Sequence, residues 1–313
     1  MTPSRARFLV KHLSFAVLVY GGRLGINLGT SLPCFACPYV AGCGGHCYLM
    51  RLQGGYGLGM SWEALTGAWG RGALGGLAVF LLLAVGLGKA WCGWICPFGT
   101  LSDWLGTARR ALGLEESRLF RPGGRRLGWV KYALLIWLVG LPPLVTAGIL
   151  HPDFHLPFCN ICPGKALLPL FAGDFRQLAL NFASPVTLAL SLALTALTGA
   201  VLAGMFFRDR FFCLFCPLLA IQNLLRPFAL LRLAKAPELC LGCGNCARNC
   251  PMEVEGVRGR ERSGRVSDPD CQTCFQCLEA CPADGPLRAE FLGFTLLASS
   301  RRLAARWRER LFR

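Results

Sequence analysis

Cysteine is the residue in this chain whose number and spacing point most directly to chemistry. Eight of the 18 cysteines form two copies of one run, C-x2-C-x2-C-x3-C, and a proline follows each run. Thiolates at this spacing hold [4Fe–4S] clusters, and the fourth cysteine of each run ligates the cluster of the other run. The two predicted ligand sets are Cys240, Cys243, Cys246 and Cys281 for the first cluster, and Cys250, Cys271, Cys274 and Cys277 for the second.

Structural zinc is the alternative for these eight cysteines, because zinc sites also use C-x2-C pairs. Two such pairs satisfy one zinc ion, so zinc leaves the third closely spaced cysteine of each run and the closing Cys-Pro unexplained. The two runs therefore favour iron–sulfur clusters and predict a protein that moves electrons.

Eight further cysteines form four pairs that indicate an internal duplication. In chain order, as outer, inner, outer and inner pairs, they are Cys34/Cys37, Cys92/Cys96, Cys159/Cys162 and Cys213/Cys216. A proline follows each pair, and corresponding pairs lie about 120 residues apart. Four thiolates match the ligand count of a [4Fe–4S] cluster, so the two inner pairs predict a third cluster and the two outer pairs a fourth.

Other interpretations of these pairs stay open. The inner cysteines could be structural, and the outer pairs could form disulfide switches if they face an oxidising compartment. A single loop could instead hold the fourth cluster through four cysteines, Cys34, Cys37, Cys43 and Cys47. The outer-pair assignment leaves Cys43 and Cys47 unassigned, and these two flank a Gly-Gly-His sequence that suits a disulfide or an added metal site.

The composition indicates a membrane protein. Hydrophobic residues make up 54% of the 313 residues and charged residues only 16%. Four apolar stretches approach the length needed to cross a hydrocarbon core of about 30 Å. They are 13–29, 73–91, 129–150 and 182–207. The first could alternatively be a signal peptide, because Arg5, Arg7 and Lys11 precede it.

The distribution of positive charge orients this predicted bundle. With four helices, 28 of the 33 Lys and Arg residues fall on the face that carries both chain ends and the middle loop. Positive charge collects on the cytoplasmic side. We therefore expect a multi-pass protein of the cytoplasmic membrane with both termini, the inner pairs and the two-run domain on the cytoplasmic side.

The predicted fold is an α-helical integral membrane protein. A four-helix transmembrane bundle, built from two parallel repeats, precedes a C-terminal cytoplasmic α+β two-[4Fe–4S] ferredoxin-like domain. The predicted segments are a first membrane half (1–110), a cytoplasmic linker (111–128), a second membrane half (129–225), an interfacial amphipathic segment (226–236), the two-cluster ferredoxin domain (237–286) and a basic amphipathic tail (287–313).

Residues of about 8–285 resemble the NapH/NosR-like membrane polyferredoxins, most specifically in WCGWICP at 91–97 and FCLFCP at 212–217. This resemblance implies a quinol-dehydrogenase-type electron-transfer subunit that exchanges electrons between a quinone pool and a partner redox protein. The chain departs from the family pattern in the two-residue spacing of Cys213/Cys216 and in its outer pairs. A quinone site needs a proton acceptor, and the candidates are His12, His151, Asp153 and His155. Each could equally be a polar residue at a helix end.

The leading functional hypothesis is an iron–sulfur membrane subunit within a respiratory complex. It would carry electrons between cytoplasmic clusters, the quinone pool and an outer-face cytochrome or iron–sulfur protein, with a cytoplasmic donor or acceptor. The alternatives are a reductase in metal or cofactor maturation and a transmembrane thiol–disulfide relay. The arginine-rich tail suits anionic lipid or an acidic redox partner, and we expect no nucleic acid partner.

Overall fold

The computed structural model describes residues 2–56, 67–115, 127–150, 154, 156–257, 264–266 and 268–311. The chain forms two compact units, each assembled from segments that are distant in the sequence. The ferredoxin unit consists of Met1–His12, Ala84–Ile95 and Gln222–Arg313, and the helical unit consists of Leu13–Leu83 and Cys96–Ile221.

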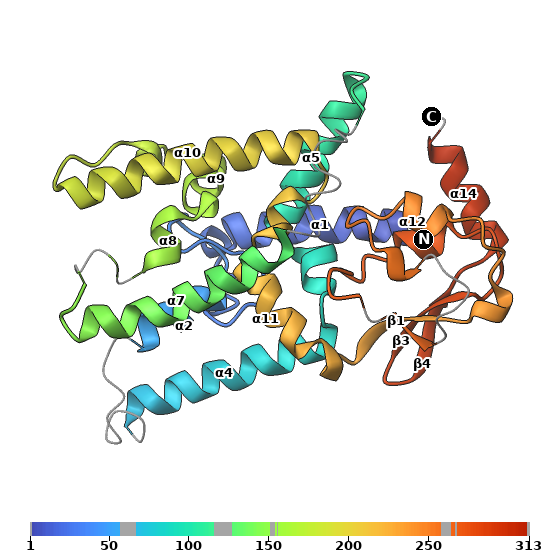
Figure 1. The fold of residues 1–313 in the computed structure, drawn as a ribbon, viewed down its shortest axis with the longest axis horizontal. Coiled ribbons are helices and arrows are strands. Elements are labelled where there is room, and N and C mark those ends of the chain that lie inside the picture. Colours follow the sequence, from blue (N-terminus) through green and yellow to red (C-terminus); the bar gives the residue numbers. More distant parts are fainter. Residues whose placement is uncertain are drawn as a thin grey trace. The chain divides into compact units, whose positions relative to one another are not determined.

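Helices dominate the helical unit (Figure 1). The helices with residues in it are α1 (Pro3–Tyr20), α2 (Tyr48–Tyr56), α4 (Ala68–Leu87), α5 (Pro97–Ala111), α7 (Val130–Thr146), α8 (Pro157–Ile161), α9 (Pro163–Phe171), α10 (Pro185–Phe207) and α11 (Pro217–Leu225). Helix α10 packs against α5, α8 and α9, and α2 packs against α7. The long axes of α4, α7 and α10 run in similar directions in Figure 1.

Helix α10 shows how the sequence sets the limits of a long apolar helix. Ser184 and Thr187 form a reciprocal capping box at its start, and Pro185 occupies the first helical position. Both features satisfy or avoid the unpaired N–H groups of the first turn. The following residues are almost all aliphatic, and Arg208 ends the helix in an extended conformation.

Among the described residues, two helices are long and apolar enough to cross a membrane, Gly70–Leu87 and Pro185–Phe207. A shorter apolar helix covers Val130–Val145. The predicted first span, 13–29, is wrong in its bounds. Helix α1 starts at Pro3 and ends at Tyr20, because a 3-10 turn over Gly21–Leu24 and the left-handed Gly25 terminate it.

The ferredoxin unit contains an antiparallel sheet in the order β2-β1-β3-β4. Its strands are β1 (Leu231–Lys235), β2 (Gly264–Arg265), β3 (Leu287–Phe291) and β4 (Phe294–Ala298). Leu231 and Leu233 of β1 lie buried opposite β3, where Leu233 pairs with the buried Ala289. Its helices are α12 (Asn245–Arg248), α13 (Gln276–Ala280) and α14 (Arg301–Leu311), and α13 packs against α12, α14 and β3.

This sheet corrects two sequence expectations. Residues 226–236, predicted as an amphipathic segment on a membrane surface, contain β1, which is paired on both sides. Burial along 231–235 alternates with period two, as in a strand with one buried face. The predicted tail, 287–313, begins with β3 and β4, so only its last part is the basic helix α14.

Candidate iron–sulfur sites

The first site is a pocket in the ferredoxin unit. All four cysteines of the first predicted ligand set line it, Cys240, Cys243, Cys246 and Cys281. Three come from the first run, and Cys281 comes from the second run, at the C-terminal end of α13. Buried Lys235 also lines the pocket, and its ammonium donates to the Val257 carbonyl at 2.6 Å. The pocket thus places a cysteine of the second run beside three of the first.

In the second predicted ligand set, the fourth cysteine comes from the first run. Cys271 and Cys277 are buried, and Cys250 of the first run lies close enough to interact electrostatically with both Cys271 and Cys274. Burial, and to a smaller extent the neighbouring Cys274, raise the pKa of the Cys250 thiol to about 12. A cluster would replace these protons, because metal ligation requires thiolates.

The two runs share the same unusual backbone. Gly242 and Gly244 in the first run have φ of 70° and 72°, and Thr273 and Phe275 at the equivalent positions of the second run have φ of 46° and 60°. This left-handed region costs a β-branched or bulky residue about 1–3 kcal/mol. The second run accepts this strain in order to keep the loop conformation that points its cysteines inward.

Helix α1 covers the second run, a contact that the sequence did not indicate. The backbone N–H of Ser4 donates to Glu279 Oε1 at 2.6 Å, and the Arg7 guanidinium lies 3.6 Å from Glu279 Oε2. Arg7 also donates to the carbonyl of Cys274 at 2.7 Å. Both charged side chains are buried, so the pair holds α1 against the loop that carries the predicted ligands of the second cluster.

The first inner-pair motif packs on the same run. Residues Trp91–Ile95 form a short π-helix, and the Trp94 indole N–H donates to the Thr273 carbonyl at 3.1 Å. A Cβ placed on Gly93 would lie 2.6 Å from the Gln272 carbonyl oxygen and 3.2 Å from Cys274 Cα. The motif therefore needs glycine at this position because two backbones touch there.

Lys89 lies next to this motif and is buried rather than extended to a membrane interface. Its ammonium donates to the side-chain oxygen of Asn223 and to the carbonyl of Pro269. Burial, and to a smaller extent the nearby Arg226 charge, lower the pKa of Lys89 to about 7. The ε-amino group therefore sits among the segments that carry Cys92 and Cys271.

The four inner cysteines divide between the two units. Cys92 belongs to the ferredoxin unit and donates its S–H to Gln222 Oε1 at 3.4 Å. Cys96, Cys213 and Cys216 belong to the helical unit. Cys96 and Cys216 immediately precede the prolines that start α5 and α11. The inner ligand set stays a prediction.

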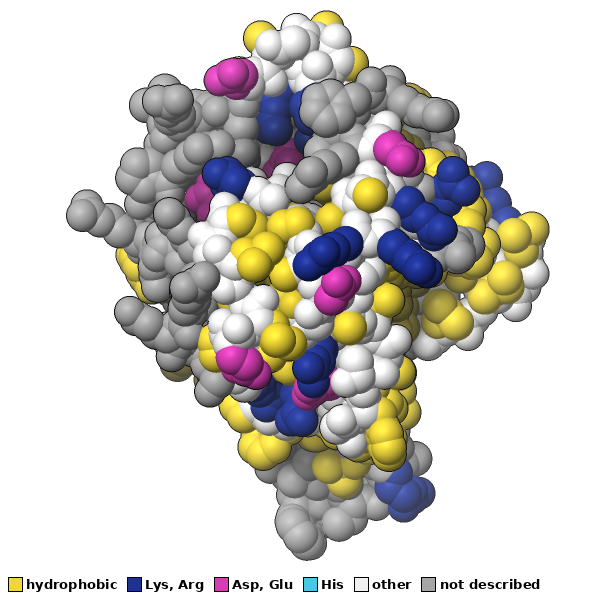
Figure 2. All heavy atoms as spheres, turned by 90° about the vertical axis from the view of Figure 1, so that its right-hand side faces the viewer, with side chains coloured by type: hydrophobic (Ala, Val, Ile, Leu, Met, Phe, Trp, Pro, Cys, Tyr) yellow, Lys and Arg dark blue, Asp and Glu magenta, His cyan; other side chains and the backbone are white. Residues whose placement is uncertain are grey.

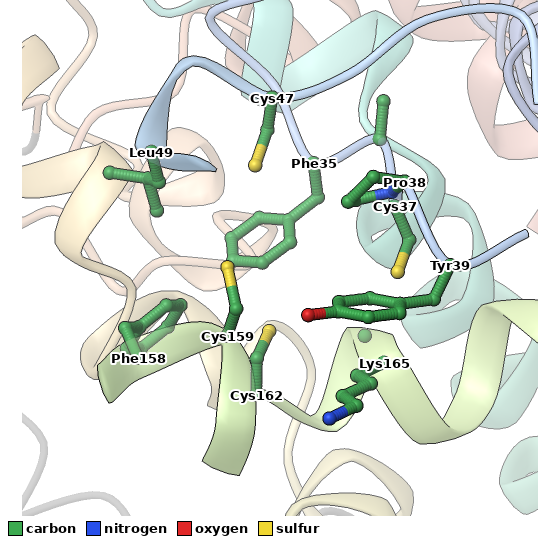
Figure 3. Close-up of a pocket in the computed structure, with 12 residues that line it drawn as sticks. Phe35, Cys37, Pro38, Tyr39, Cys47, Leu49, Phe158, Cys159, Cys162 and Lys165 are labelled. Carbon is green, nitrogen blue, oxygen red and sulfur yellow. The ribbon is translucent and has the colours of Figure 1, made fainter. Parts of the chain in front are cut away.

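A second cysteine pocket lies in the helical unit, and its cysteines differ from the predicted outer set. Cys37, Cys159 and Cys162 line it together with Cys47, whereas Cys34 is not among its lining residues (Figure 3). The fourth lining position thus belongs to Cys47, which the sequence left unassigned. Cys43 pairs elsewhere, since its sulfur lies 3.1 Å from His46 Nε2.

The outer pairs are not separated from the inner pairs by the thickness of a membrane. Phe35, between Cys34 and Cys37, has its ring centroid 5.3 Å from that of Phe98 and 5.1 Å from that of Phe212. Phe98 lies two residues after Cys96, and Phe212 immediately precedes Cys213. The prediction of opposite faces is therefore wrong, because a hydrocarbon core is about 30 Å thick.

The candidate quinone residues are mostly outside the described structure. His151, Asp153 and His155 all lie outside the described residues. His12 is half-buried in α1, with Nδ1 2.7 Å from the Phe8 carbonyl of the preceding turn. This bond is the ordinary one for a polar residue in a helix.

In the described part of the chain, no group of three or more His, Cys, Asp or Glu side chains is arranged to hold a single metal ion. Zinc–sulfur distances of about 2.3 Å would bring four sulfurs to one point. The sulfurs instead border pockets, as a four-iron cluster requires, and none of the 18 cysteines is in a disulfide. The residues present therefore fit clusters.

Known proteins support iron–sulfur binding by these segments. A family model described as a 4Fe-4S binding domain matches residues 69–115 and again 188–234, the two segments with the inner pairs. A model described as a 4Fe-4S dicluster domain matches residues 232–282. The ferredoxin-type protein NapH of Haemophilus influenzae is 24% identical over 66% of this chain and 64% of its own length. The regulatory protein NosR of Pseudomonas aeruginosa is 27% identical over 59% of this chain and 22% of its own length.

The chain is a NapH/NosR-like polyferredoxin. This polyferredoxin is also 29% identical to YccM of Escherichia coli K12, which is named as an electron transport protein, over 67% of the chain. The match spans about half of YccM, 54% of its length. No solved structure is significantly similar to this polyferredoxin. The repeated match of one family model to both halves supports the internal duplication inferred from the cysteine pairs.

Proposed function

We propose that this polyferredoxin is a membrane-bound electron carrier that joins a two-cluster ferredoxin domain to cysteine sites among its apolar helices. The contact between the Trp91–Ile95 motif and the second ferredoxin run carries this proposal. Cys92 and Cys274 belong to segments whose backbones touch. A cluster that takes Cys92 as a ligand would therefore have this ligand close to the second ferredoxin cluster.

The two ferredoxin sites differ in exposure, and this difference indicates which cluster exchanges electrons with a cytoplasmic partner. Cys243 of the first site is exposed, and its neighbour Leu241 keeps 63% of its surface exposed. Cys271 and Cys277 of the second site are buried, and Arg7 of α1 bonds to the carbonyl of Cys274 between them. A cytoplasmic donor or acceptor would therefore meet the first cluster, and the second cluster would connect it to Cys92 in the same unit.

Membrane attachment rests on the long apolar helices. Helices α4 and α10 contain spans of 18 and 23 residues. Helix α7, with 17 residues, extends about 26 Å at 1.5 Å per residue, close to the ~30 Å hydrocarbon core. Helix α1 contributes only its apolar second half, because its residues up to His12 belong to the ferredoxin unit. We assign both termini to the cytoplasmic side, where the Lys and Arg residues collect.

Helix α14 supports contact between the ferredoxin unit and the membrane surface. Arg301, Arg302 and Arg306 are exposed on it, and exposed Phe294 and Leu296 of β4 precede it. Basic and apolar side chains lie next to one another on the face shown in Figure 2. Anionic lipid headgroups attract such basic segments by about 1 kcal/mol per residue.

The terminal electron exchange is with the quinone pool or an outer-face redox partner. Relatives named as electron transport and ferredoxin-type proteins favour this role in a redox complex. A thiol–disulfide relay has less support, because Cys37, Cys159 and Cys162 are at most 8% exposed and a disulfide partner must reach the sulfur.

Vesicles with ferricyanide trapped inside test the route. Dithionite added outside reduces the outward-facing ferredoxin unit, and the absorbance of ferricyanide reports electrons that have crossed. We expect transfer by the wild-type protein, almost none by Cys92→Ser, and wild-type transfer by Cys43→Ser, the matched control. Wild-type transfer no faster than leakage into protein-free vesicles, with and without menaquinone, would refute the proposal.

A further inference from the structure

We infer that Cys37, Cys47, Cys159 and Cys162 hold a [4Fe–4S] cluster inside the helical unit, with Cys47 as the fourth ligand instead of Cys34. This cluster would add a further electron-carrying centre to the proposed function. Its role in electron transfer rests on that proposed function. The ligand set itself rests on the pocket, on the backbone that places Cys47 there and on the polar groups around the sulfurs.

The pocket brings together side chains from two segments that are distant in the sequence. Cys37 and Cys47 come from the loop between α1 and α2, and Cys159 and Cys162 come from α8 and its C-terminal end. Their side chains point toward the same space in Figure 3. Four thiolates around one buried space are the ligand number and arrangement of a [4Fe–4S] cluster.

The backbone fixes Cys47 at this pocket. The N–H of Cys47 donates to the Ala36 carbonyl at 2.9 Å, beside Cys37, and the N–H of Tyr48 donates to the Leu32 carbonyl at 3.0 Å. A Cβ on Gly44 would overlap the carbonyl oxygen of Val17. The Gly-Gly sequence before His46 therefore lets the loop pass against α1, and the loop then returns to place Cys47 opposite Ala36.

Gln53 provides a second, independent indication of a ligand. This amide is completely buried, and its Nε2 donates to Cys159 Sγ at 3.3 Å and to the Leu49 carbonyl at 3.0 Å. Its Oε1 accepts from the N–H of Phe158 at 2.8 Å. Burying an amide is costly unless its groups are bonded, and an N–H directed at sulfur is a standard way to tune a cluster.

Positive charge at the pocket matches the charge of a cluster. Four thiolates and a [4Fe–4S]2+ core carry a net charge of about −2. Lys165 lines the pocket, with its ammonium 4.7 Å from the centre of the Tyr39 ring and 3.4 Å from Asn160 Oδ1. Cys162 is the N-cap residue of α9, whose N-terminal dipole also favours thiolate.

Iron and sulfide content of anaerobically purified protein tests this ligand set. We expect Cys47→Ser to lower the iron content by about four atoms per chain, with a matching loss of sulfide. Cys34→Ser is the matched control, because Cys34 is just as buried and does not line the pocket, so its iron content should equal that of the wild type. Mössbauer spectra of 57Fe-labelled protein identify which centre is lost.

The opposite results overturn the inference. Loss of four irons in Cys34→Ser with none in Cys47→Ser would restore the symmetric outer set. An unchanged iron content in both variants, or one zinc ion at this site, would show that no cluster is bound there. The EPR signals of the ferredoxin clusters are counted separately, so these outcomes leave the proposed electron route testable in the vesicle experiment.

The Gln53→Met variant provides a second test in case the Cys47→Ser protein does not accumulate. Methionine has a similar length and no N–H, so the variant keeps every cysteine and loses the donor to Cys159. We expect the reduction potential of one cluster to fall, because an N–H···S bond stabilises the more negative, reduced cluster. The ferredoxin potentials should not change, and a titration with every potential unchanged would overturn the inference.

Discussion

The close approach of Gly93 to the second ferredoxin run gives a sharp test of how the inner-pair motif contacts that run. Replacing Gly93 with alanine adds a Cβ 2.6 Å from the Gln272 carbonyl oxygen and 3.2 Å from Cys274 Cα. The obstructing atoms belong to backbone and cannot rotate away, so the two segments must separate. Such overpacking costs about 1–3 kcal/mol.

Loss of the second cluster to an iron chelator measures this cost. If the cluster leaves through local opening of this contact, 1–3 kcal/mol increases the open population about 5- to 150-fold. We expect Gly93→Ala to release iron from the second cluster faster by this factor. Its EPR signal should broaden, because the Cys274 loop carries a predicted ligand.

Gly86→Ala is the matched control for this experiment. It lies seven residues earlier, within α4, and a Cβ there would meet no atom within 4 Å. Alanine stabilises a helix interior by about 0.5–1 kcal/mol relative to glycine. Iron release should therefore match that of the wild type. Equal release rates for Gly93→Ala and Gly86→Ala would refute the packing argument.

Three further predictions concern the ferredoxin unit. Arg7→Met should destabilise it by about 3–5 kcal/mol, because it leaves Glu279 buried without its charge partner, whereas Arg301→Met at an exposed ion pair should cost at most about 1 kcal/mol; thermal unfolding followed by near-UV circular dichroism compares them. Thr273→Gly should slow iron release by relieving about 1 kcal/mol of left-handed strain, and a faster release would contradict this. Cys250→Ser should remove the EPR signal of the second cluster and spare the first, and the reverse loss would exclude the crossed ligands.

The ferredoxin sites could be predicted from sequence because their ligands follow a fixed local spacing. Cys240 and Cys243 need only a short loop to converge, and the closing cysteines follow within the same run. The strand β1 could have been recognised from the alternation of Leu231, Leu233 and Lys235, which is a period of two rather than of a helix. The amphipathic interpretation gave too much weight to the arginines.

The pocket of the helical unit could be predicted only in part. The matched Cys-Pro sequences drew attention to Cys37, Cys159 and Cys162, which line the pocket, but symmetry pointed to Cys34 as the fourth residue. The position of Cys47 depends on a hydrogen bond to Ala36, eleven residues earlier, and no repeat in the sequence encodes that loop closure. The Gly44-Gly45 sequence, which permits the loop to pass close to α1, was the available signal.

Contact between α1 and the second run has a consequence for the timing of biosynthesis. Ser4 and Arg7 bond to Glu279 and Cys274, which follow them by 275 and 267 residues. A ribosome adds about 5–20 residues per second, so the start of α1 waits roughly 15–55 s for its partner. During that interval Arg7 lacks the groups that bury it and pair with it in the folded chain. Delivery of iron to the second site therefore follows completion of the apolar helices.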